Sequence, residues 1–118
     1  MKNKVALIIG AGDSLGSSIA RVFANEGLTV VVARRNGDKL SSLAEEIKEN
    51  GGECFFYSLD ARKEDDVINL INKIENEIGE ILVVVYNIGA NIRYGILETT
   101  SRKYYKVWEM AAFGAFLM

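Results

Sequence analysis

The chain has 118 residues, a formal net charge of −2 and 49% hydrophobic residues. This length fits one domain with a core, and the near-neutral charge gives no electrostatic footprint for a nucleic-acid partner. The absence of histidine excludes histidine-based triads and most transition-metal sites within the chain, so we expect no metal. No apolar run approaches roughly 18 residues, so we expect no membrane span. The single cysteine, Cys54, excludes an intrachain disulfide, fits a cytoplasmic location and is interpreted as a packed core thiol.

The first predicted elements are a strand, a helix and a second strand. Val5–Ile9 is apolar and β-branched, which predicts a strand. Residues 15–26 then place apolar side chains at helical spacing before Gly27, which predicts a helix with these side chains in the core. They are Leu15, Ile19, Val22 and Phe23. Residues 28–33 form a nearly continuous apolar run, typical of a parallel strand buried on both faces.

The same alternation continues through the rest of the chain. A helix with its apolar face at Leu40–Ile47 is predicted next, followed by a strand at Cys54–Leu59. A helix over Val67–Ile78, which Gly79 ends, precedes a strand at Ile81–Tyr86. A loop over 87–98 then leads to a last helix, capped by Thr99, Thr100 or Ser101. Strands and helices that alternate with short connections are typical of a parallel sheet with helices on both faces. We therefore expect an α/β fold.

A glycine-rich turn, Ile-Ile-Gly-Ala-Gly-Asp-Ser-Leu-Gly at residues 8–16, joins the first strand to the first helix. Leu15 stands where G-x-G-x-x-G requires glycine, so the spacing is G-x-G-x-x-x-G. Ser17 follows Gly16 where a phosphate-binding loop needs lysine. Glycines can serve a turn for backbone reasons alone. Between a strand and a helix N-terminus, however, this turn indicates a nucleotide pyrophosphate site.

Two arginines, Arg34 and Arg35, end the second predicted strand. A site selective for NAD places an acidic residue there, about 20 residues after the glycine turn, for the ribose hydroxyls. A guanidinium group can instead bind a 2′-phosphate bidentately or stack on adenine. The alternative is a pair of solvated arginines. We favour NADP over NAD as the cofactor, and the missing acid also argues against a methyltransferase.

The wider pattern resembles the short-chain dehydrogenase/reductase family. That family's turn, T-G-x-x-x-G-x-G, aligns with residues 9–16: both outer glycines match, while Ile9 replaces the threonine and Ser14 the middle glycine. Asp60-Ala61 stands where the family has an adenine-contacting aspartate, and Asn87-Ile88-Gly89 resembles its N-A-G segment. Asp60 could alternatively cap the next turn, and the segment 87–89 could simply form a turn.

This resemblance implies a Rossmann-like sheet with strand order 3-2-1-4 and a nicotinamide dinucleotide partner. The residues expected to bind the cofactor lie in the glycine turn and after the later strands. They are Gly10, Gly12, Asp13, Ser14, Leu15, Gly16, Arg34, Arg35, Asp60, Ala61, Asn87, Ile88 and Gly89.

The catalytic residues of the resembled family are missing. Its chemistry uses a serine and a Y-x-x-x-K pair, often with an earlier asparagine; no Y-x-x-x-K occurs here, and Ala111 stands at the asparagine position. We therefore predict no catalytic residue and no turnover by the isolated chain. The whole chain 1–118 is interpreted as the cofactor-binding half of a longer, NADP-preferring oxidoreductase that acts on a carbonyl or alcohol. The alternatives are a non-catalytic dinucleotide-binding protein and a self-associating structural fragment.

Homo-oligomers are also expected. In the family's strand order the fourth strand borders later strands, so here its apolar edge at 81–86 would lie uncovered. The last helix adds apolar residues at Tyr105, Trp108, Phe113, Phe116 and Leu117. Exposed apolar patches of this kind are rare on monomers, so either surface or both would pair with a second copy.

Overall fold

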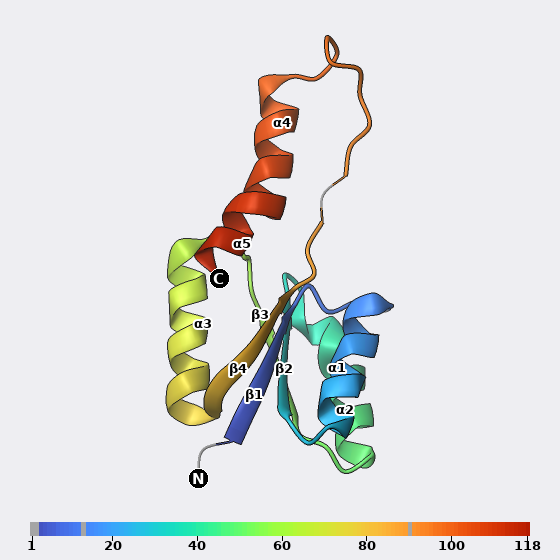
Figure 1. Cartoon of the computed structure of the whole chain (residues 1–118), viewed down its shortest axis with the longest axis vertical. Helices are drawn as coiled ribbons and strands as arrows, with labels where there is room; N and C mark the ends of the chain where they lie inside the picture. The colour runs from blue at the N-terminus through green and yellow to red at the C-terminus, as the bar shows by residue number, and fades with distance from the viewer. Residues whose placement is uncertain (1–2, 13, 90) are drawn as a thin grey trace.

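The computed structural model describes residues 3–12, 14–89 and 91–118. Four parallel strands form one sheet: β1 (Asn3–Ile9), β2 (Thr29–Arg34), β3 (Cys54–Ser58) and β4 (Gly79–Tyr86). Their order is β3-β2-β1-β4, which confirms the predicted order. Helices α1 (Leu15–Asn25) and α2 (Ser41–Glu49) cover one face, and α3 (Glu64–Glu77) covers the other (Figure 1). A 3₁₀ turn, η1 (Gly37–Leu40), precedes α2.

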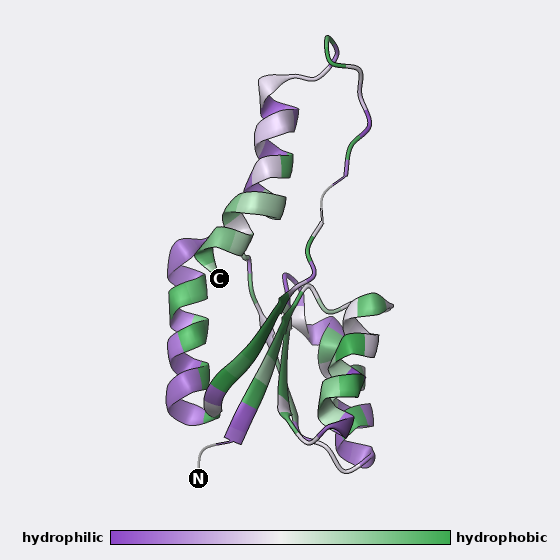
Figure 2. Ribbon diagram, in the orientation of Figure 1, coloured by the Kyte–Doolittle hydropathy of each residue, from purple (hydrophilic) through white to green (hydrophobic). Residues whose placement is uncertain are grey.

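The two faces of the sheet follow from the alternation of side chains along β1. Val5, Leu7 and Ile9 belong to the core on the α3 side, whereas Ala6 and Ile8 belong to the core beneath α1 and α2. All five are at most 1% exposed. Figure 2 shows the same pattern as hydrophobic strands between helices of mixed hydropathy. An apolar run therefore buries both of its faces, as parallel strands sandwiched between helices do.

The predicted core side of α1 is partly wrong. Leu15 and Val22 are 61% and 59% exposed, although both fall in the expected apolar stripe. The buried residues of α1 are instead Gly16, Ser17 and Ala20. A Cβ on Gly16 would lie 2.6 Å from the Ala11 Cα, so the helix approaches the turn on its small residues. Ile19 and Phe23 pack against the core as predicted, whereas this close approach leaves Leu15 and Val22 facing solvent.

The other core predictions agree with the structure. Leu43, Ala44 and Ile47 of α2 and Val67, Leu70 and Ile74 of α3 are buried. Cys54 is 1% exposed, and burial raises the pKa of its thiol to about 11, as expected of a packed core residue. β4 begins at Gly79, which was predicted to end the preceding helix, because Asn3 extends the pairing of β1 to that point.

The two ends of the last helix lie in different surroundings, one away from the sheet and one beside it (Figure 1). Thr100 caps α4 (Ser101–Trp108), and no residue of α4 is buried. A π-helical turn, η2 (Glu109–Phe113), leads into α5 (Gly114–Leu117). There the chain returns to the sheet, and Leu117 packs against the core on the α3 side. The prediction that Leu117 belongs to an exposed apolar patch is therefore wrong. Among the described residues, no helix is long and apolar enough to cross a membrane.

Candidate functional site

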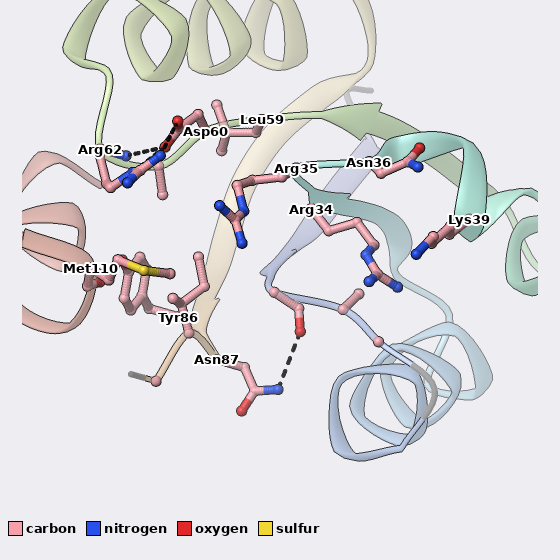
Figure 3. A pocket seen from close by; sticks show the side chains of 16 residues that line it. Arg34, Arg35, Asn36, Lys39, Leu59, Asp60, Arg62, Tyr86, Asn87 and Met110 are labelled. Atoms are coloured by element: carbon pink, nitrogen blue, oxygen red, sulfur yellow. Dashed lines mark hydrogen bonds and ion pairs between the residues drawn. The ribbon is translucent and has the colours of Figure 1, made fainter. Parts of the chain in front are cut away.

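A cleft of about 610 Å³ lies at the carboxyl edge of the sheet, where the four strands end (Figure 3). Open parallel sheets bind their ligands at this edge. The predicted residues that line the cleft are Gly10, Gly12, Arg34, Arg35, Asp60, Ala61, Asn87, Ile88 and Gly89. Ser14, Leu15 and Gly16 do not line it, and Asp13 lies outside the described residues. The rest of the lining is Ala11, Asn36, Lys39, Leu59, Arg62, Tyr86 and Met110.

The glycines of the turn serve different purposes. Gly10 has φ +85°, and a Cβ there would lie 2.8 Å from the Asn87 carbonyl carbon, so the crossing of two chain segments requires glycine. At Gly12 an added Cβ would meet nothing within 4 Å. Its backbone therefore borders open space in the cleft, as close approach of a ligand requires. Gly16 permits the approach of α1 described above.

Asn87 joins the turn to the end of β4. Its backbone N–H donates to the Ile9 carbonyl at 2.8 Å, and its Nδ2 donates to the Gly10 carbonyl at 3.3 Å. Residues 87–89 form no regular turn, and Asn87 instead has a structural role between the glycine turn and β4, at a position that also lines the cleft. The two interpretations are compatible, because the side chain braces the turn from the cleft side.

Basic side chains dominate one end of the cleft. Figure 3 shows Arg34 and Lys39 close together and Arg35 projecting toward the middle of the cleft. Within the described ranges, none of these three side chains makes an ion pair with a carboxylate. Lys39 was missed by the sequence reasoning. Its signal was its position five residues after Arg34, within the turn that follows β2.

That turn is held in place by packing. The Gly37 N–H donates to the Ser58 Oγ at 2.9 Å, and a Cβ on Gly37 would lie 2.6 Å from the Ser58 nitrogen. Leu40, the last residue of η1, is 2% exposed. The lysine between these two anchors is therefore presented on a fixed backbone.

Asp60, the one carboxylate among the described residues that line the cleft, is already engaged. Asp60 accepts hydrogen bonds from the backbone N–H and the guanidinium of Arg62, which realises the turn-capping alternative. These bonds and the neighbouring positive charge lower the pKa of Asp60 to about 2. The adenine contact of Asp60 stays a prediction.

Tyr86 and Met110 close the opposite side of the cleft. The Tyr86 hydroxyl donates a hydrogen bond to the Met110 carbonyl, and burial together with the nearby Asp60 charge raises the pKa of Tyr86. Neither residue was predicted. Tyr86 carried a signal, since it directly precedes Asn87 at a strand end, whereas Met110 reaches the cleft only because the last helix returns to the sheet.

Comparison with known proteins identifies the family. The chain matches the short chain dehydrogenase family over residues 4–118, and it belongs to that family. It is 33% identical over 91 residues to the uncharacterized oxidoreductase YxbG of Bacillus subtilis, covering 77% of this chain and 33% of the relative. The chain thus spans about a third of that relative.

Two solved structures support the same assignment. A short-chain dehydrogenase from Rhodopseudomonas palustris superposes with a TM-score of 0.92 at 45% identity, over 99% of this chain and 55% of that chain. An actinorhodin polyketide ketoreductase solved with NADPH gives 0.88 at 29% identity, over 97% and 44%. The chain therefore has the Rossmann-like fold of this oxidoreductase family, and it spans about half of each of these structures.

Proposed function

We propose that this chain is the cofactor-binding part of a longer NADP-preferring oxidoreductase that acts on a carbonyl or alcohol. The proposal extends the family assignment to one cofactor and one class of substrate. The similarity to a polyketide ketoreductase solved with NADPH supports both choices. The coverage of about half of the related structures supports a longer whole protein.

The charge balance of the cleft is the observation that carries the NADP preference. Among the residues that the structure describes, four basic side chains line it (Arg34, Arg35, Lys39 and Arg62), and one carboxylate does, that of Asp60. Arg62 pairs with that carboxylate, which leaves Arg34, Arg35 and Lys39 without an ion-pair partner among the described residues. Like charges held close together repel, so an anion bound between them is favoured. The 2′-phosphate of NADP supplies such an anion, whereas the ribose hydroxyls of NAD do not.

The experiment is calorimetric titration of the chain with NADP⁺ and NAD⁺. We expect wild type to bind NADP⁺ more tightly, and Arg34→Ala with Arg35→Ala to remove most of that preference. Each charge-assisted hydrogen bond contributes roughly 1.5–3 kcal/mol before solvent screening, so the ratio of affinities should fall by about tenfold or more. Arg93→Ala, an exposed arginine outside the cleft, is the control. Equal losses for both cofactors would contradict the proposed phosphate contact.

The second candidate function is dinucleotide binding without turnover. Ala111 lies in η2 and is exposed, and an alanine side chain cannot relay a proton. Together with the missing Y-x-x-x-K this favours a sensor or structural role if the whole protein also lacks those groups. Its sequence beyond this chain decides the matter, since an intact Y-x-x-x-K with an upstream serine supports the enzyme.

The proposal includes self-association and a cytoplasmic location. Leu82 and Val84 of the edge strand β4 are 59% and 42% exposed. On the last helix a row of aromatic rings runs through Trp108 and Phe113, whose centroids lie 5.4 Å apart. These surfaces suit a second copy or a further segment of a longer chain. The buried, unreactive Cys54 fits a reducing compartment.

A further inference from the structure

Arg62 is held from two sides at the rim of the cleft. Its Nε donates to the Asp60 Oδ1 at 2.9 Å and its Nη2 to the Asp60 Oδ2 at 2.8 Å. On the other side its Nη1 lies 3.8 Å from the Glu109 Oε1 in η2. The three side chains are 30%, 18% and 24% exposed for Arg62, Asp60 and Glu109, so the cluster is mostly shielded from water. This planar guanidinium therefore has little freedom to swing away.

The same contacts decide how much of the Asp60 carboxylate stays available. An ionised carboxylate offers about four acceptor positions. Oδ1 accepts two hydrogen bonds, from the Arg62 Nε and from the Arg62 backbone N–H at 3.1 Å, and Oδ2 accepts one. One acceptor position on Oδ2 is left, on a group that lines the cleft together with Ala61.

We propose that Arg62 is a positioning residue for the adenine end of the nucleotide site. By occupying three acceptor positions of Asp60, it leaves a single fixed acceptor for the exocyclic amino group of the base. The inference rests on the proposed dinucleotide binding and on the predicted contact of Asp60 with adenine. It adds that Arg62, with Glu109 behind it, sets the selectivity for adenine over a base that carries a carbonyl at the same position.

The test compares NADP⁺ with its hypoxanthine analogue, deamino-NADP⁺, whose base has a carbonyl oxygen in place of the amino group. A carbonyl oxygen facing the Asp60 acceptor loses a hydrogen bond and meets a like partial charge. We therefore expect wild type to prefer NADP⁺ by about tenfold or more. In Arg62→Gln the preference should fall to less than about threefold, because the carboxylate is no longer held in one orientation.

Two variants guard against a purely structural explanation. Arg62→Lys keeps the charge and the aliphatic stem but not the two-pronged geometry, so it should lose base preference in the same way. Arg21→Gln breaks another arginine–glutamate pair, Arg21–Glu46 at 3.0 Å, outside this cleft, and should keep the wild-type preference. The ratio of NADP⁺ to NAD⁺ affinity should stay unchanged in Arg62→Lys and Arg21→Gln, since both keep the charge of the cleft and its phosphate-facing cations.

Selective loss of base preference in both Arg62 variants, with the NADP⁺/NAD⁺ ratio retained in Arg62→Lys, supports the inference. Equal weakening of NADP⁺ and deamino-NADP⁺ would overturn it, and so would a wild type without base preference or Arg62 variants that keep the wild-type preference. A wild type that discriminates between bases but not between NADP⁺ and NAD⁺ would refute only the phosphate proposal. A wild type that binds neither dinucleotide overturns the proposed function and the inference with it.

Discussion

The sheet with its covering helices and the helical arm formed by α4 place their apolar side chains in different surroundings. In β1 and β2 the central residues, such as Leu7 and Val31, are fully buried between helices on both faces. In α4, whose residues are all described, none is buried, and Tyr104, Tyr105 and Trp108 are 68%, 55% and 42% exposed. The strands are covered by α1, α2, α3 and the end of the last helix, whereas α4 leaves its apolar side chains exposed, and we propose that a partner covers them. Core substitutions should therefore act on stability, and arm substitutions on association.

The largest expected effect is on the sheet. Leu7→Ala should lower the free energy of unfolding by about 2–5 kcal/mol, because it leaves a cavity among fully buried neighbours. Tyr105→Ala in the arm removes a larger side chain that is 55% exposed, and should change the free energy of unfolding by less than about 0.5 kcal/mol. Urea denaturation at one low protein concentration measures both. Similar losses for the two variants would break the contrast between the regions.

Self-association should show an intermediate effect. We expect the chain to sediment as a dimer or larger species at micromolar concentration. Val84→Lys places a charge on the open β4 strand, and Phe116→Ser removes an apolar side chain that is 81% exposed on α5. Each should weaken association by about tenfold if its surface forms the interface.

The matched control for this measurement is Ile68→Lys, which changes an apolar residue of α3 that is 48% exposed. It should leave the sedimentation of the chain unchanged. A wild type that remains monomeric would show that neither the β4 edge nor the last helix binds a second copy.

The smallest expected effect is on the pH dependence of stability, through the carboxyl group of Asp60. Its pKa is lowered from 3.8 to about 2 in the folded chain by the hydrogen bonds from Arg62. A depressed carboxyl pKa stabilises the fold above the unfolded value, and this contribution is lost as pH falls through about 4 toward 2. Allowing for screening, Asp60→Asn should cost about 1 kcal/mol near neutral pH and almost nothing near pH 2. Thermal unfolding across this range measures the difference, which a pH-independent cost would contradict.

The sequence by itself determined the sheet and the place of the cleft. Alternating apolar runs and helical stripes predicted the four strands, because burial on both faces leaves a continuous apolar pattern. Since parallel strands all end at one edge, residues that follow them, such as Gly10, Arg34, Asp60 and Asn87, had to gather there. The strands needed only local patterns, whereas the strand order and the choice of Asp60 and Asn87 as site residues came from the family resemblance.

Tertiary structure alone decided the rest. Leu15 and Val22 face solvent because α1 packs on the sheet through its glycine, serine and alanine residues. The distance between this helix and the sheet is not encoded in the periodicity of the sequence. Met110 lines the cleft and Glu109 contacts Arg62 because the last helix folds back beside Tyr86, far away in sequence. The remaining acceptor on Asp60 depends on the orientation of Arg62, and such contacts are set by packing between distant segments rather than by local residue pattern.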